Sequence, residues 1–220
     1  RIHEIANYLE KNTEITKDSF VRNTTTVTNE QKSSFPLLNS LPVNVNLEGY
    51  LFPDTYRIFK NASVKDIINK MLTTLESKIT DQMRADVKKQ GKTIHEILTM
   101  ASLIEKEVRS KEDMQIVSGI FWNRVNKGMR LESDATLSYY FDDNLSAHSG
   151  DALKAETPYN SYKYEGLPPT PIGNPGLNAI NAAIYPTKTN YFYFLSGNDG
   201  TTYYAETYNA HLKNKKNHLN

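Results

Sequence analysis

The sequence predicts an α+β fold in which a helical portion is followed by a small antiparallel β region. Apolar residues recur with helical spacing between residues 61 and 126, and two aromatic-rich runs flank a glycine-rich loop near residue 200. Six of the nine prolines fall between residues 158 and 186, where they separate these two parts. Because helices come first and the hairpin comes late, the order excludes a doubly wound α/β fold.

The N-terminal part of the chain divides into two segments. Residues 1–20 are predicted to form one short amphipathic helix and the start of another, with an apolar side made of Ile2, Ile5, Ala6 and Leu9. Residues 21–46 are rich in Thr, Asn and Ser and contain two prolines, which predicts a connecting or peripheral segment. We therefore expect a domain boundary after residue 46 and a main domain over residues 47–220.

Four helices are predicted next, each from its apolar stripe and its end signals. Ser63 is the expected N-cap of the first helix and Thr93 that of the third, where Glu96 completes a capping-box pattern. Gly91 and Gly128 are expected to end the second and the fourth. The predicted ranges are 61–78, 80–90, 93–109 and 113–126.

The region after these helices changes in character. The proline-dense stretch 158–186 is expected to hold neither regular helix nor central strand, because proline lacks a backbone donor and restricts its own backbone. Residues 191–195 and 201–205 flank a loop of sequence Gly-Asn-Asp-Gly, which predicts a β-hairpin.

Composition excludes several classes of function. Lys and Arg number 26 against 25 Asp and Glu, so the chain lacks the charge excess of a strongly basic nucleic-acid binder. It has no cysteine, and its five histidines are scattered without ligand spacing, so we expect no metal and no cofactor. No run approaches the roughly 18 apolar residues of a membrane helix. Because the chain begins with Arg1, we expect it to be a piece of a longer protein.

One carboxylate interrupts an apolar stripe in the predicted helix 93–109. Positions 94, 98, 101, 105 and 108 run along its apolar side, and Glu105 occupies one of them, whereas Glu107 lies nearly opposite. Periodicity by itself favours an edge position or an ion pair for Glu105. The alternative is a catalytic acid, since partial burial raises the pKa of a carboxyl group and keeps it protonated near neutral pH.

Four further stretches, in this order along the chain, carry a family resemblance. Together with the glutamate segment they closely resemble the YceG-like family, whose members are endolytic murein transglycosylases, and the resemblance runs from Leu47 to the C-terminus. It implies that residues 1–46 are the end of a small LysM-like module. The stretches are Glu48-Gly49-Tyr50-Leu51-Phe52-Pro53-Asp54-Thr55-Tyr56, Ala101-Ser102-Leu103-Ile104-Glu105-Lys106-Glu107, Asn123-Arg124 with Gly128-Met129-Arg130-Leu131, Tyr159-Asn160-Ser161-Tyr162, and Gly166-Leu167-Pro168-Pro169.

The resemblance also implies roles for individual residues. Glu105 corresponds to the catalytic glutamate of the family. Glu48 and Asp134 are expected to orient sugar hydroxyls or stabilise positive charge, with a helix cap or an arginine partner as the alternative. Arg124 and Arg130 suit the carboxylates of the lactyl group or the stem peptide. The other candidates for substrate binding are Tyr50, Asn123, Tyr159, Asn160, Tyr162 and Asn174.

The implied activity is cleavage of the MurNAc–GlcNAc bond of peptidoglycan glycan strands, with formation of 1,6-anhydroMurNAc ends and no cofactor. The family further implies an N-terminal membrane anchor absent from this chain, a catalytic domain outside the cytoplasm, and peptidoglycan synthases as partners. The alternative is a non-catalytic peptidoglycan-binding module. A pyridoxal-phosphate lyase, a name also attached to this family, is disfavoured because no lysine in an apolar setting and no phosphate loop is found.

Overall fold

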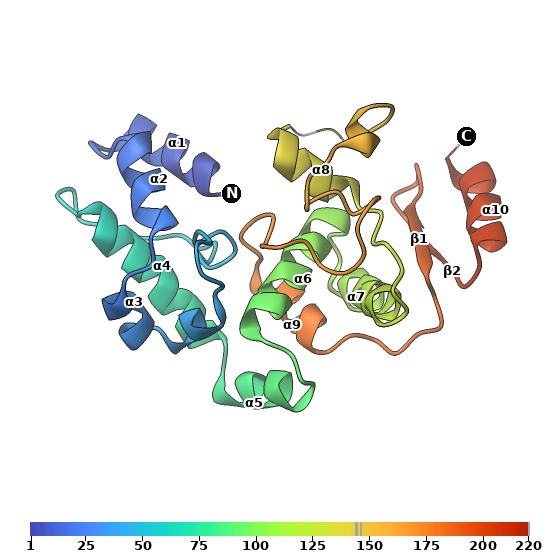
Figure 1. The fold of residues 1–220 in the computed structure, drawn as a ribbon, viewed down its shortest axis with the longest axis horizontal. Helices are drawn as coiled ribbons and strands as arrows, with labels where there is room; N and C mark the ends of the chain where they lie inside the picture. The colour runs from blue at the N-terminus through green and yellow to red at the C-terminus, as the bar shows by residue number, and fades with distance from the viewer. Residues whose placement is uncertain (144, 146, 220) are drawn as a thin grey trace. The chain divides into compact units, whose positions relative to one another are not determined.

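A computed structural model describes residues 1–143, 145 and 147–219 of the chain (Figure 1). In these residues it is mostly helical, and its single sheet has two antiparallel strands close to the C-terminus, which confirms the α+β prediction. The chain forms two compact units. Unit 1 consists of residues 1–102 and 170–177, and unit 2 consists of residues 103–169 and 178–220.

Unit 1 is built from helices that the sequence signals largely anticipate. Ser63 caps α4 and accepts the backbone N–H of Asp66, whose carboxylate returns the contact in a capping box. The apolar stripe of α4 is buried at Ile67, Ile68 and Leu72 among others. The elements of this unit are α1 (Ile2–Asn12), α2 (Lys17–Thr25), α3 (Asn29–Ser34), η1 (Pro36–Ser40), α4 (Val64–Lys78), α5 (Asp81–Lys89) and the larger part of α6 (Ile94–Glu107).

The segment 21–46 is more structured than a connecting segment. It contains the end of α2, all of α3 and the 3-10 helix η1, because its polar residues serve as helix caps. Thr28, for example, accepts the N–H of Gln31 and so begins α3 in a polar sequence. Leu37 and Leu38 are buried, so this segment contributes to the core of unit 1. The predicted division between residues 46 and 47 stays a prediction.

Unit 2 is organised around α7 (Lys111–Asn126). The indole N–H of Trp122 donates to the backbone oxygen of Ala183 at 3.0 Å, which holds α9 (Leu177–Ile184) in place. A Cβ at Gly119 would lie 2.2 Å from the backbone oxygen of Thr187, so glycine is required at this close approach. The remaining elements are α8 (Asp134–Phe141), η2 (Ala152–Lys154), β1 (Tyr193–Ser196), β2 (Thr202–Ala205) and α10 (Tyr208–His218).

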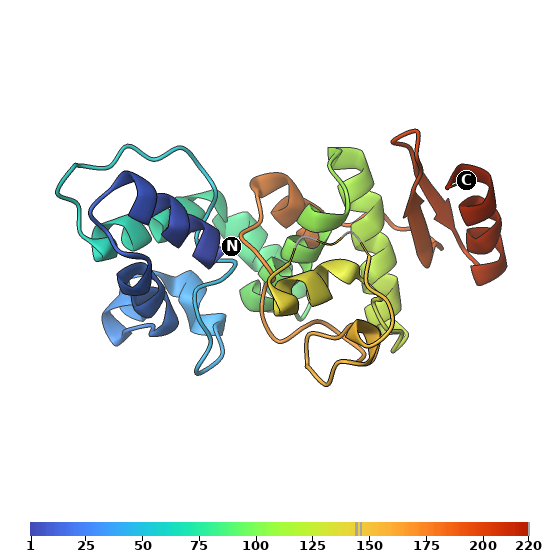
Figure 2. The ribbon, with the colours of Figure 1, turned by 90° about the horizontal axis from the view of Figure 1, so that it is seen from above.

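Two sequence expectations about this region have different outcomes. The hairpin is confirmed, with Phe194 opposite Tyr204 in an antiparallel register, and α10 lies beside it in both views (Figures 1 and 2). The expectation that 158–186 holds no regular helix is wrong, because α9 fits between Pro175 and Pro186. Proline restricts only its own backbone and that of the residue before it, so a short helix fits between two prolines.

Within the described residues, every helix falls short of the length and apolar character that crossing a bilayer requires.

Candidate active site at the end of helix α6

Helix α6 is buried on all sides for most of its length. Every residue from Ile97 to Ile104 is buried, so in this part of the helix the apolar stripe does not mark a single buried face. The cover ends at the last turn, where Glu105 and Lys106 are exposed and Glu107 is half-buried. Glu105 thus has the edge position that periodicity favours, and the partial burial invoked for a catalytic acid is not found there, because burial depends on what packs against each turn and not on the stripe alone.

Glu107 is the carboxyl at this helix end that is withdrawn from water. Its Oε1 accepts the hydroxyl of Ser133, the residue that precedes α8. Burial raises the pKa of Glu107, the Ser133 hydrogen bond lowers it, and the neighbouring charge of Asp134 raises it again, so that the net shift is upward. The partial burial considered as the alternative for Glu105 is thus found two residues later, at Glu107.

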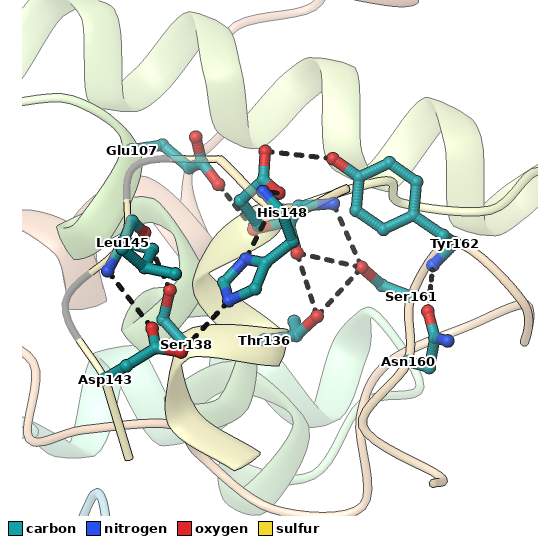
Figure 3. A network of polar contacts seen from close by, with 11 residues as sticks. Glu107, Thr136, Ser138, Asp143, Leu145, His148, Asn160, Ser161 and Tyr162 are labelled. Atoms are coloured by element: carbon teal, nitrogen blue, oxygen red, sulfur yellow. Dashed lines mark hydrogen bonds and ion pairs between the residues drawn. The ribbon is translucent and has the colours of Figure 1, made fainter. Parts of the chain in front are cut away.

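Ser133 joins Glu107 to a buried polar network (Figure 3). Its backbone N–H donates to Ser161 Oγ at 2.9 Å, and Ser161 Oγ donates back to the backbone oxygen of Ser133 at 3.1 Å. The hydroxyl of Thr136 donates to the same oxygen at 2.8 Å and lies 3.0 Å from Ser161 Oγ. These hydrogen bonds hold the start of α8 to the loop before residue 162.

Asp134 and Tyr162 form the partly accessible side of this network. The phenol of Tyr162 donates to Asp134 Oδ2 at 3.0 Å, and the backbone N–H of His148 donates to Asp134 Oδ1 at 2.8 Å. Burial raises the pKa of Tyr162, and the charge of Asp134 raises it further, so the phenol remains a donor. The side chain of Asp134 is 28% exposed and is therefore accessible to a ligand.

The imidazole of His148 lies between two carboxylates. Its Nδ1 is 3.4 Å from Asp134 Oδ1, and its Nε2 is 3.3 Å from Asp143 Oδ2. Figure 3 shows the contact between the imidazole of His148 and the carboxylate of Asp143. Both distances exceed that of a strong charge-assisted hydrogen bond, so the firm contact between this loop and Asp134 is the one from the backbone N–H of His148.

Three other predicted binding residues belong to the same part of unit 2. Asn160 is buried, and its side chain binds backbone atoms of Leu153, Ala155 and Tyr162, so it shapes the loop. Tyr159 is half-buried, with its ring centroid 5.2 Å from that of Tyr139. Arg130 is exposed.

Asn123 and Arg124 are engaged inside unit 2. Arg124 is 6% exposed, and its guanidinium donates to the backbone oxygens of Phe192, Arg130 and Leu131 and to the carboxylate of Glu132. The side-chain amide of Asn123 donates to the backbone oxygens of residues 189 and 191. These contacts give Asn123 and Arg124 a structural role. The exposed Arg130 is therefore a better candidate than Arg124 for binding an anionic ligand.

Glu48, Tyr50 and Asn174 lie in unit 1, where their polar atoms bind other groups of the protein. Glu48 is 3% exposed and accepts from the backbone N–H of Ile2 at 3.0 and 3.2 Å and from the Asn174 amide at 3.0 Å. Asn174 in turn accepts from the backbone N–H groups of Gly49 and Leu51. Tyr50 is fully buried with its hydroxyl 3.0 Å from His95 Nδ1.

The structure thus brings together Asp134, Asn160 and Tyr162 of the predicted residues, and it adds four that the sequence did not single out. These are Glu107, Ser133, Ser161 and His148. Glu107 and Ser161 lie inside stretches that carry the family resemblance, and Ser133 lies two residues after another, so their place in the sequence is a signal that could have found them. Their pairing could not be found in this way, because it joins segments about 26 to 28 residues apart.

Comparison with known proteins confirms the family resemblance. The chain belongs to the YceG-like family, which it matches over residues 1–217. A crystal structure of a YceG-like protein from Listeria monocytogenes has 31% sequence identity and a TM-score of 0.87, covering 96% of this chain and 72% of that one.

Two relatives carry the name endolytic murein transglycosylase. The Bacillus subtilis (strain 168) protein is 36% identical over 200 residues, which cover 88% of this chain and 55% of that protein. The Streptococcus pneumoniae serotype 2 protein is 36% identical over 195 residues, which cover 84% of this chain and 35% of that protein. The chain therefore spans between about a third and just over half of these relatives.

Proposed function

We propose that this chain is the glycan-cleaving part of an endolytic murein transglycosylase. The names of its relatives support this proposal. The observation that carries it in the structure is an exposed carboxyl, Glu105, on a helix turn whose other side is joined to a serine, aspartate and tyrosine network. An exposed carboxyl beside polar and aromatic side chains is within reach of a long polysaccharide strand, as a proton donor to a glycosidic oxygen has to be.

In the proposed reaction Glu105 is both acid and base. Its carboxyl proton passes to the oxygen between MurNAc and GlcNAc as the bond from that oxygen to MurNAc C1 breaks. The C6 hydroxyl of the same MurNAc then attacks C1, and its proton returns to Glu105. The products are a 1,6-anhydroMurNAc end and a free GlcNAc hydroxyl, and no water is consumed. Because the nucleophile belongs to the same sugar, little entropy is lost in positioning it.

The candidate binding residues then fall into two groups. We assign direct contact with the glycan to Tyr159, Tyr162, Asp134 and Arg130, which are exposed or half-buried. We assign an indirect role to those whose polar atoms bind within the protein, since their loss would deform the loops that carry the contacts. This second group is Glu48, Tyr50, Asn123, Arg124, Asn160 and Asn174.

Other features of the proposal come from the resemblance to the family. They are a LysM-like origin of residues 1–46, an N-terminal membrane anchor, action outside the cytoplasm and association with peptidoglycan synthases. Locating the full-length protein in membrane fractions tests the anchor and the place of action, and co-purification with synthases tests the association.

The decisive experiment compares Glu105→Gln with wild type on purified glycan strands, with products identified by mass spectrometry. We expect release of 1,6-anhydro ends to fall by about 100-fold or more, because the amide cannot transfer a proton. Glu112→Gln, at an exposed glutamate of α7, is the matched control and should keep wild-type activity. Near wild-type product from Glu105→Gln would refute the assignment.

The alternative of a non-catalytic glycan-binding module makes a different prediction in the same experiment. Such a module would be retained on insoluble peptidoglycan and would release no anhydro product from any variant, wild type included.

A further inference from the structure

The two glutamates at the end of α6 have different surroundings. Residues two apart on a helix point about 200° from each other, so Glu105 and Glu107 project from opposite sides of the same turn. Glu105 is exposed, whereas Glu107 is half-buried and bound to Ser133. A contact that holds Glu107 therefore also holds the backbone turn from which Glu105 projects.

Ser133 is an unusual N-cap. Seven residues that precede other described helices accept a backbone N–H from the first turn with their own side chains, namely Thr16, Thr28, Ser63, Thr80, Thr93, Ser110 and Thr207. Ser133 makes no such bond to α8, and its hydroxyl binds Glu107 instead. A serine cap is typically worth about 1 kcal/mol to a helix, so this stabilisation of α8 is given up for the link to α6.

We propose that Glu107 is a positioning residue for Glu105, acting by fixing the last turn of α6 through Ser133 to the start of α8 and to Ser161. The inference rests on the proposed function, because Glu105 is the acid whose direction matters. The same Ser133 precedes Asp134, which binds Tyr162. The link thus places the acid in a constant geometry relative to the residues proposed to hold the sugar.

Charge determines which form of Glu107 suits this role. The negative charge of Asp134, on α8, acts on Glu107. The phenol of Tyr162 also lies near Glu107, but it donates its proton to Asp134. A second ionised carboxylate at Glu107 would repel Asp134 in a partly buried place. The neutral carboxyl accepts from Ser133 without this repulsion, which agrees with the raised pKa of Glu107.

The test compares Glu107→Ala, Glu107→Gln and Ser133→Ala on purified glycan strands. We expect Glu107→Ala to lower kcat by about 10- to 100-fold with little change in KM, because misplacing a catalytic group by a fraction of an ångström has effects of this order. Glu107→Gln keeps a neutral acceptor and should recover most of the turnover. Ser133→Ala should resemble Glu107→Ala, and the double variant should be no worse than the single ones.

The pH profile separates positioning from simple destabilisation. Part of the decline of wild-type kcat at rising pH should come from the ionisation of Glu107, so the decline should be smaller in Glu107→Gln. Wild-type kcat in Glu107→Ala would overturn the inference. So would complete loss of product in Glu107→Gln, because Glu107 would then be the proton donor itself.

Failure of the proposed function can be recognised separately. If wild type releases no anhydro product, hydrogen exchange of the amides at residues 105–108 still decides the positioning role. Faster exchange in Glu107→Ala that Glu107→Gln reverses supports the link, and unchanged exchange overturns it. Glu112→Gln is again the control, since it alters an exposed glutamate outside this contact.

Discussion

Glu48 in unit 1 is buried and Glu107 in unit 2 is half-buried, and burial raises the pKa of both carboxyls. They differ in how fully their oxygens are used. Both oxygens of Glu48 accept the N–H of Ile2, and one also accepts the Asn174 amide. Glu107 has one hydrogen bond among the described residues, from Ser133, and it remains half-buried.

The comparison shows that a raised pKa does not by itself identify a functional carboxyl. Glu48 is surrounded by donors that belong to the framework of unit 1, so its role is to join the start of α1 to the loop carrying Asn174. Glu107 stands at the end of a helix beside an exposed glutamate and a partly exposed aspartate. Unused hydrogen-bonding capacity and access to solvent distinguish the second carboxyl from the first.

The largest expected effect is on the stability of unit 1. Glu48→Ala should lower the free energy of unfolding by about 2–4 kcal/mol, because it leaves the N–H of Ile2 and the Asn174 amide without their acceptor in a buried place. Urea unfolding measures the change, with Glu14→Ala at an exposed position as the control. A loss below that of the control would remove the structural role from Glu48.

Glu107→Ala should have the opposite balance of effects. It removes one hydrogen bond from a half-buried group, so we expect a loss of about 1 kcal/mol in unfolding free energy. Its effect on turnover should exceed that of Glu48→Ala when activity is expressed per folded molecule. If Glu48→Ala lowers kcat as strongly as Glu107→Ala, the distinction between the two carboxyls fails.

A smaller effect is expected at the accessible side of the network. Tyr162→Phe removes the donor to Asp134 but keeps the ring, so unfolding free energy should fall by about 1 kcal/mol or less in this partly exposed pair. Retention on insoluble peptidoglycan should weaken slightly in Tyr162→Phe and clearly in Tyr162→Ala. Unchanged retention in both variants would make Tyr162 a structural residue.

The smallest expected effect is on how the unfolding free energy varies with pH. Because the folded pKa values of Glu48 and Glu107 are raised, the stability linked to each is present below the ordinary glutamate pKa and is lost as the pH rises through the folded value. Unfolding free energy of wild type should therefore decline from acidic to neutral pH by this contribution. The decline should be shallower in Glu48→Gln and in Glu107→Gln, and an equal slope in all three proteins would contradict the linkage.

The local elements could be predicted because their signals lie within a few residues of one another. Ser63 and Asp66 form their capping box inside one turn of α4, and Gly91 follows the end of α5 with a positive φ of 70°. The hairpin likewise follows from its own aromatic residues and loop. Proline density does not predict the helix between Pro175 and Pro186, because it describes a whole region and not the residues between two prolines.

The sequence by itself determined the family and the α+β class, since these depend on motifs and short-range patterns, and it also predicts a catalytic residue on the last turn of α6. Only the tertiary structure decided which carboxyl on that turn is sheltered. Glu107 is bound by Ser133, which comes 26 residues later and whose hydroxyl binds the glutamate and does not cap its own helix. Periodicity records which residues share a face, but the segment that covers that face is chosen by contacts distant in sequence.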